Sequence, residues 1–450
     1  VKCFEKVRLI HVWRWGKYWG VPAGLLKLLL QVFSFQKTII VDGSHSKPVH
    51  TVNAIIPGSA FSCAILHIVL LWPCDKLLQL YPSIRLAKYV DDLTITVKGP
   101  RDEAADLAVR ATKHLVLALE NGLGMEVSKT VGGKAGKSVV LTSHVGMKAR
   151  MFQAMTRLGL RFEGRERYLG VDCYGKGKRK GTSTRTKRMR LMQIRAGRLR
   201  VLKKDGAKVR KVVLAGVKPS VLYGCKTMGL ADGHIRSLRR VVSSCLPGQH
   251  LGRSTTLRLA LHKADVQQEC DAAPIVAWSA AIWDNTMVAE ELEDAWYQQQ
   301  KAVGLHRKWS KVTGPAGACV MSAARMGWSW SRYDVFKDRQ GRELRLHDVC
   351  PQDIRAMAAL DSEAAMWQRW TDQTQWVKLA PAPCVEPLRQ LCNTKKLNHA
   401  TKRAVEHIAT IGTATQTTLQ SWGYVDSGLC QACGKPGTPH HRFWLCSAHN

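Results

Sequence analysis

Apolar residues recur at helical spacing from Val7 to Phe33, and Gly20-Val21-Pro22 interrupts the pattern. Glycine and proline together end one helix and admit the next, so this segment predicts two consecutive helices. The side chains expected to face the core are those of Trp13, Trp15, Leu25 and Leu29. A short strand over Lys37–Val41 then leads into a polar turn at Asp42-Gly43-Ser44.

The clearest alternation of apolar and polar residues lies between Ile84 and Val97. Two runs of period two flank Asp91 and Asp92, which predicts a hairpin with both carboxylates at its tip. Carboxylates on a rigid tip suit a hard cation such as Mg²⁺. The alternative is an ordinary turn with solvated side chains, because aspartate is common in turns.

Helices and further strands surround this hairpin. Ile55-Ile56-Pro57-Gly58 ends a strand and turns into an apolar helix from about Ala60 to Leu71, and a glycine at such a turn lets a ligand approach the backbone. Arg101–Gly122 has helical spacing, with Gly122 at its end. Lys129 lies on an extended segment, and Tyr168–Val171 predicts a strand. These elements together predict an α+β fold.

The second half of the chain is mainly helical in pattern. A helix is expected from about Thr186, others from Val212 to about Leu246, and more at Ala289–Val303 and Ile354–Trp370. Trp328 and Trp330 could stack on bases, but a buried core is the more frequent use of tryptophan. No chemistry is assigned to residues 259–425.

Charge changes this picture, because 68 Lys and Arg face 34 Asp and Glu, giving a net charge of +34. Such a surplus indicates a polyanionic partner, either nucleic acid or an anionic membrane. Gly175–Lys211 is the most basic stretch, and Asp205 is its one acidic residue. Counterion release from a phosphate backbone would compact it, and a solvated charged face is the alternative.

A membrane or secreted location is not favoured by the sequence. The longest apolar run, Phe61–Leu71, is too short to span a bilayer and is broken by Ser62 and His67. No signal peptide pattern is present at the N-terminus, and most of the 14 cysteines are scattered, as in reduced proteins. These features predict location in the nucleus and cytoplasm, without a membrane partner.

The C-terminus carries a ligand pattern, Cys430-x2-Cys433-x7-His441-x4-Cys446. Two close thiolates followed by a histidine and a third cysteine suit tetrahedral, structural Zn²⁺. His440 competes with His441, and the gap to Cys446 favours His441. Phe443 or Trp444 could stack on an unpaired base. Unrelated free cysteines are the alternative.

Several motifs resemble, in order, those of non-LTR (LINE-type) retrotransposon reverse transcriptases. Tyr89-Val90-Asp91-Asp92 resembles the Tyr-x-Asp-Asp box, and Val1–Val7 the end of the first palm box. Three further segments resemble the second, fourth and fifth boxes of the family: Gly58–Ser62, Gly122-Leu123 with Val127–Thr130, and Tyr168–Val171. The C-terminal cluster of cysteines and histidine is also typical of such elements. The resemblance covers Val1 to about Met228 and the last twenty-odd residues.

The resemblance implies RNA-directed DNA synthesis by two Mg²⁺ ions, with Asp91 as the main metal ligand and Asp92 supporting it. It implies that Phe4 lies under the sugar of the incoming nucleotide, that Gly58 lies near that nucleotide, and that Lys129 protonates the departing pyrophosphate. A solvated lysine and a core phenylalanine are the alternatives. Pro57 and Cys63 depart from the family's Gln and Pro, which puts nucleotide handling in doubt.

The same resemblance implies an N-terminally truncated enzyme, because the first catalytic aspartate would fall before Val1. We therefore expect a partial palm at 1–174, a basic helical thumb at 175–258, a helical connector at 259–425 and a zinc knuckle at 426–450. The implied partners are an RNA template, a DNA primer or target, and deoxynucleotides. Two rivals remain: a nucleic-acid-binding remnant without catalysis, and a structural helical protein with a zinc finger.

Overall fold

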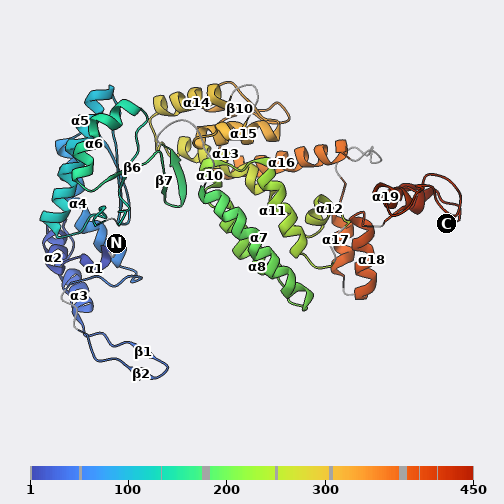
Figure 1. The fold of residues 1–450 in the computed structure, drawn as a ribbon, viewed down its shortest axis with the longest axis horizontal. Coiled ribbons are helices and arrows are strands. Elements are labelled where there is room, and N and C mark those ends of the chain that lie inside the picture. Colours follow the sequence, from blue (N-terminus) through green and yellow to red (C-terminus); the bar gives the residue numbers. More distant parts are fainter. Residues whose placement is uncertain are drawn as a thin grey trace. The chain divides into compact units, whose positions relative to one another are not determined.

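The computed structural model describes residues 3–49, 53–132, 134–174, 183–248, 252–303, 308–373, 383–394, 396–412 and 414–448. The chain divides into two compact units (Figure 1). The first contains Val1–Glu166 and Tyr174–Gly177, and the second contains Arg167–Cys173 and Lys178–Asn450.

The first unit begins with α1 (Cys3–Lys6), α2 (Leu9–Tyr18) and α3 (Ala23–Ser34). The predicted break at Gly20-Val21-Pro22 is confirmed, since Pro22 immediately precedes α3. Trp13 and Trp15 pack against the core, and Leu29 lies within it. The prediction for Leu25 was wrong, because α3 turns the neighbouring Leu26 inward and leaves Leu25 exposed.

Helix α4 (Ser62–Leu80) is longer than the sequence indicated and continues through Pro73. By length and composition it could cross a membrane, and it is the one helix in the described ranges that could. A core helix of a soluble protein passes the same test. Ile65, Leu66, Val69 and Leu70 of α4 are buried with α2 and α3, which is the behaviour of a core helix.

The hairpin of β3 (Arg85–Tyr89) and β4 (Asp92–Thr96) forms as predicted. Leu86 pairs with Ile95 and Lys88 with Leu93, so these side chains share one face. The apolar members of that face pack against Leu77 of α4 and Leu115 of the following helix, α5 (Arg101–Leu117). The opposite face carries Asp92 and remains open.

The rest of the first unit is a set of short elements. Helix α5 continues into a π-turn, η1 (Ala118–Gly122), and packs against α6 (Val145–Arg157). Its strands are β1 (Ile40–Val41) and β2 (Ser44–His45), and the parallel pair β5 (Val139–Val140) and β6 (Arg161–Phe162). The hairpin of β7 (Arg165–Tyr168) and β8 (Val171–Tyr174) follows in the chain, and its residues Arg167–Cys173 belong to the second unit. The chain thus mixes helices with small sheets, which is compatible with an α+β fold. No sheet in the described ranges exceeds three strands, so a continuous palm sheet is not seen.

The second unit starts with a helical cluster. It contains α7 (Ser183–Lys204), α8 (Arg210–Val212), η2 (Val213–Val217), α9 (Lys218–Leu222), α10 (Cys225–Met228) and α11 (Asp232–Cys245). Met192, Ala196 and Leu199 of α7 are buried against Leu238 and Val242 of α11. Their spacing is the apolar stripe that a 3.6-residue period places on one face.

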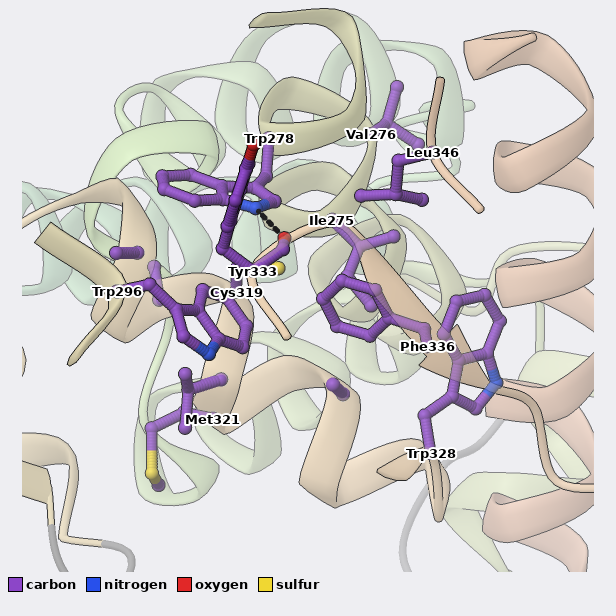
Figure 2. Packing of buried hydrophobic residues seen from close by; sticks show 14 of the residues in the cluster. Ile275, Val276, Trp278, Trp296, Cys319, Met321, Trp328, Tyr333, Phe336 and Leu346 are labelled. Carbon is purple, nitrogen blue, oxygen red and sulfur yellow. Dashed lines mark hydrogen bonds between the residues drawn. The ribbon is translucent and has the colours of Figure 1, made fainter. Parts of the chain in front are cut away.

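The core of the following region is rich in tryptophan (Figure 2). Its helices are α12 (Thr255–Leu261), α13 (Gln267–Trp283), α14 (Ala289–Val303), η3 (Trp309–Lys311), α15 (Pro315–Met326) and α16 (Pro351–Gln373). The Nε1 of Trp278 donates to the carbonyl of Tyr333 at 2.8 Å, and the Nε1 of Trp328 donates to Asp361 at 2.6 Å. Trp328 is therefore a core residue, and Trp330 packs against the same cluster, with its ring 5.8 Å from that of Trp296.

One part of this region was not predicted. Three short antiparallel strands, β9 (Ser329–Trp330), β10 (Val335–Lys337) and β11 (Glu343–Arg345), form a small sheet. Runs of two or three residues are too short to show an alternation. The chain ends with α17 (Glu386–Asn393), α18 (His399–Ala409), α19 (Gln416–Ser421) and η4 (His441–Leu445).

Candidate functional site

The tip of the β3–β4 hairpin is a two-residue turn at Val90 and Asp91. Val90 has a φ of 55°, as a tight hairpin turn requires, and Asp92 pairs with Tyr89 as the first residue of β4. Asp91 and Asp92 are both exposed. The tip therefore presents two carboxylates to solvent from a rigid support.

Residues in or next to three of the sequence motifs share one core cluster with the hairpin turn. Phe4, Ile56 and Val90 all pack against one buried cluster around Leu26 and Leu66. The backbone N–H of Ile55 donates to the carbonyl of Phe4 at 2.9 Å, which joins the first motif to the segment that leads into the second. Burial, and then the charge of Asp91, raise the pKa of Cys3 to about 11. Val1 and Lys2 lie outside the described residues.

Gly58 lies at the exposed end of the second motif and has a φ of 88°, which disfavours any other residue. A Cβ there would meet no atom within 4 Å, so the space above the turn is open. The start of α4 is fixed by Ser62, whose Oγ donates to the carbonyl of Ile56 at 2.5 Å. Pro57 is exposed next to Gly58.

Lys129 has a partner. Its Nζ lies 2.5 Å from Oε2 of Glu120, and both side chains are about three-quarters buried, at 27% and 28% exposed. Its role as a proton donor to pyrophosphate stays a prediction, and it requires this ion pair to open.

The carboxylates at the tip do not complete a site for two Mg²⁺ ions. Among the described residues, the only group of three or more potential ligands is at the C-terminus and does not include Asp91 or Asp92. Two adjacent carboxylates supply too few oxygens for a two-metal centre. These two residues alone therefore do not fit a pair of catalytic Mg²⁺ ions.

The C-terminal group consists of Cys430, Cys433, His441 and Cys446, whose ligand atoms all lie within 4.8 Å of one another. Sγ of Cys446 is 3.8 Å from Sγ of Cys430 and 3.8 Å from Sγ of Cys433. Tetrahedral Zn²⁺ with Zn–S bonds of about 2.3 Å sets its sulfurs about 3.8 Å apart. Nε2 of His441 lies 3.0 Å from Sγ of Cys433. These residues fit Zn²⁺.

The backbone around the first two cysteines is a tight knuckle. Cys430 N–H donates to the carbonyl of Lys435 at 2.7 Å, and Gly434 N–H donates to the carbonyl of Cys430 at 2.8 Å. Gly434 has a φ of 67°, which favours glycine. Hydrogen bonds from the backbone N–H of Ala432, and then from His441, lower the pKa of the Cys430 thiol to about 6. A thiolate is the form that binds a metal.

The metal group rests on α19, which the sequence did not indicate. The hydroxyl of Thr417 donates to the carbonyl of Gly437 at 3.0 Å, and Gly437 N–H donates to the carbonyl of Gly428 at 2.8 Å. A Cβ on Gly437 would lie 2.7 Å from Cβ of Gln416. The module therefore begins near Thr415. The side chains of Phe443 and Trp444 lie outside the described ones.

Two arginines of the basic stretch Gly175–Lys211 make contacts within the protein. Arg185 is buried, and Arg188 lies over the ring of Tyr223, 4.8 Å from its centroid, while donating to that residue's carbonyl. Tyr223 in turn donates to the carbonyl of Leu169 at 2.7 Å, in the turn between β7 and β8. Arg188 and Tyr223 thus fasten the turn to α7. Lys176, Lys178, Arg179 and Lys180 lie outside the described residues.

Some of the exposed basic residues that remain lie beside the seam between α7 and α11. Gln193 donates to the hydroxyl of Ser237 at 2.8 Å, and Lys203 donates to the carbonyl of Ser244 at 3.0 Å, so the helices run in the same direction. The exposed arginines beside this seam are Arg190, Arg200, Arg236 and Arg240. Arg236 and Arg240 come from outside the predicted basic segment.

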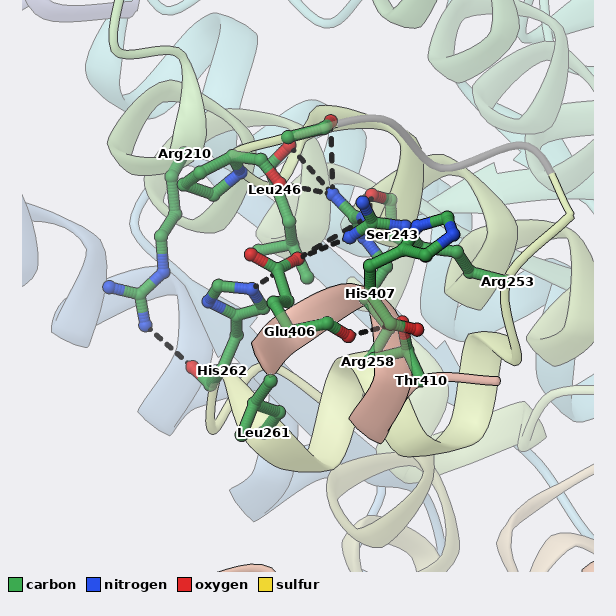
Figure 3. Close-up of polar contacts among 12 residues, drawn as sticks. Arg210, Ser243, Leu246, Arg253, Arg258, Leu261, His262, Glu406, His407 and Thr410 are labelled. Carbon is green, nitrogen blue, oxygen red and sulfur yellow. Dashed lines mark hydrogen bonds and ion pairs between the residues drawn. The ribbon is translucent and has the colours of Figure 1, made fainter. Parts of the chain in front are cut away.

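A buried ionic cluster next to these helices was also missed (Figure 3). Arg258 is fully buried and donates to the carbonyls of Ser243, Leu246, Pro247 and Gly248 at the end of α11. Oε1 of Glu406, on α18, lies 3.0 Å from Arg253, 3.4 Å from Arg258 and 3.3 Å from His262. One carboxylate thus serves three basic side chains.

The chain matches no protein-family model, and no curated protein gives a significant match to it.

Proposed function

We propose that the protein binds nucleic acid and carries a nucleotidyl-transfer centre of the RNA-directed DNA polymerase type, as in non-LTR retrotransposons. The observation that supports this best is that Phe4, Ile56 and Val90, the last beside Asp91, pack against one core cluster. Motifs that are separate in the sequence thus occur together, with open space above Gly58. The partners would be an RNA template and a DNA primer.

A nucleic-acid-binding protein without catalysis is the second candidate. It is favoured by the absence of a third ligand near Asp91 and Asp92 among the described residues. Both candidates require the basic surface, and only the first requires the hairpin tip.

Neutralising the arginines beside the α7–α11 seam is expected to make binding less dependent on salt. Each phosphate contact contributes about 0.7 to 0.9 to the slope of log affinity against log salt. Replacing Arg190, Arg200, Arg236 and Arg240 with Gln should therefore lower that slope by about 3. Fluorescence anisotropy with labelled RNA at several salt concentrations measures it.

The control removes the same charge from exposed positions distant in sequence. It replaces Lys301, Lys311, Lys337 and Arg355 with Gln. An equal loss of slope in the control would mean that binding is diffuse and that the seam has no special role.

Primer–template binding in Mg²⁺, measured beside primer extension, distinguishes the two candidates, because only the first requires the hairpin tip. Residues 1–450 should bind an RNA template annealed to a DNA primer but not extend it, because the tip offers only two carboxylates. Extension that disappears in Asp91→Asn would show that the tip suffices for catalysis. If Asp91→Asn and Asp92→Asn leave both extension and primer–template binding unchanged in Mg²⁺, the polymerase proposal fails.

A further inference from the structure

Two helix faces of the second unit expose apolar side chains. The inner face of α7 is buried through Met192, Ala196 and Leu199, while the outer face carries Leu191, Ile194, Val201 and Leu202. These four side chains are 45% to 58% exposed. Residues three, four and seven apart share a helix face, so Leu191, Ile194, Arg198 and Val201 form one stripe.

The second face belongs to α14 and the turn before it. The inner face of α14 is buried through Leu292, Trp296 and Val303. Tyr297 lies on the outer face, and Trp283, Met287 and Val288 precede the helix. These four side chains are 42% to 65% exposed. Several large apolar side chains exposed over one short stretch of chain favour an interaction surface.

The charges on the two faces are opposite. Residues 264–300 contain no Lys or Arg, although the whole chain has 68 of them. Glu290, Glu293 and Asp294 accompany Tyr297 on the outer face of α14, at spacings of three, four and seven. On α7, Arg195 and Arg198 lie between the apolar pairs. A polyanion would be repelled from α14, so nucleic acid is not its partner.

The faces also match in length and order. Leu191 and Val201 are about 15 Å apart along α7, from a rise of about 1.5 Å per residue. Val288 and Tyr297 are about 14 Å apart by the same measure. On each face, charged side chains lie between apolar ones. The central charges are arginines on α7 and carboxylates on α14.

We propose that the outer face of α14 binds the outer face of α7 in a second copy of this chain. The contact is heterologous, because each copy contributes a different face, so it can repeat from copy to copy. At physiological salt the Debye length is about 8 Å. The arginines of α7 and the carboxylates of α14 can therefore attract each other at contact, while the repulsion between the net charges of the two copies is screened. The proposal does not depend on polymerase activity, and it uses different arginines from the seam.

Sedimentation velocity of nuclease-treated protein tests this proposal. Wild-type protein should show a mass that rises with concentration beyond the dimer. Glu293→Lys with Asp294→Lys, or Arg195→Glu with Arg198→Glu, should each weaken association by roughly tenfold or more, because like charges then face each other. Unchanged thermal unfolding of each variant checks that it is folded.

Mixing the two variants is the decisive measurement. One has two basic faces and the other two acidic faces, so each fails alone and the mixture should regain association. A mixture that stays monomeric, or variants that associate like wild type, would overturn the proposal. A wild-type chain that remains monomeric at high concentration would also overturn it.

Discussion

His441→Ala in the full-length chain is expected to weaken zinc binding more than roughly hundredfold, because four ligands share a binding free energy of about 10–16 kcal/mol. His441 is buried, with Nε2 3.0 Å from Sγ of Cys433. The adjacent His440 is exposed and belongs to no ligand group in the described part of the chain. His440→Ala should therefore change the affinity by no more than about twofold.

Cobalt substitution reports which residues bind the metal, and hydrogen exchange reports how far the metal stabilises the surrounding backbone. The Co²⁺ form should show thiolate charge-transfer bands and tetrahedral d–d absorption, both reduced in His441→Ala. Chelation should speed amide exchange in the knuckle and also in α19, because Thr417 holds Gly437. Equal effects of the two histidine variants would contradict the ligand assignment. Exchange that is fast in both states would contradict the structural role of the metal.

Interactions between residues close together in the sequence could be predicted in this module, and those between distant residues could not. Cys430, Cys433, His441 and Cys446 lie within 17 consecutive positions, and their spacing alone indicates a tetrahedral site. The support from α19 depends on Thr417 meeting Gly437, and nothing in the spacing of either residue signals that contact. The predicted start at residue 426 therefore left out the helix on which the module rests.

At the hairpin and in the basic segment, too, local patterns could be predicted from the sequence and contacts between distant residues could not. The period of two around Asp91 and Asp92 is a local signal, and the register follows from it. Arg185 and Arg188 look like surface charges in a basic run. Their burial and stacking depend on contacts with residues remote in sequence, such as Tyr223. Charge counting in this segment therefore overestimated the number of basic side chains that are free at the surface.

The ion pair between Glu406 and Arg258 could not have been predicted from the sequence. The two residues are 148 positions apart, and arginine is seldom fully buried. Burial lowers the pKa of Arg258 to about 10, and the charge of Glu406 acts in the opposite direction. Glu406→Gln removes the one carboxylate that Arg253, Arg258 and His262 share. Leaving buried charges without a counterion costs about 3–5 kcal/mol. We expect a loss of this size in the unfolding free energy of the second unit.

The matched control is Glu386→Gln in α17, whose carboxylate pairs with Arg389 but is 50% exposed. An exposed pair of this kind contributes about 0–1 kcal/mol. Urea unfolding of both variants, followed by tryptophan fluorescence, gives the comparison, since 11 of the 15 tryptophans belong to the second unit. Similar small losses in the two variants would mean that the buried arginines are satisfied by backbone carbonyls alone.

The pH dependence separates the charge of Glu406 from its packing. Burial alone would raise the pKa of Glu406, but the hydrogen bond from His262 and the charges of Arg258 and Arg253 outweigh it and lower the pKa below 4.5. A carboxyl group with a lowered pKa stabilises the fold fully above its unfolded value, and this contribution is lost as the pH falls through the folded value. The difference between wild type and Glu406→Gln should therefore be constant near neutrality and shrink below pH 4.5. A difference that persists unchanged in acid would assign the loss to shape and hydrogen bonding instead of charge.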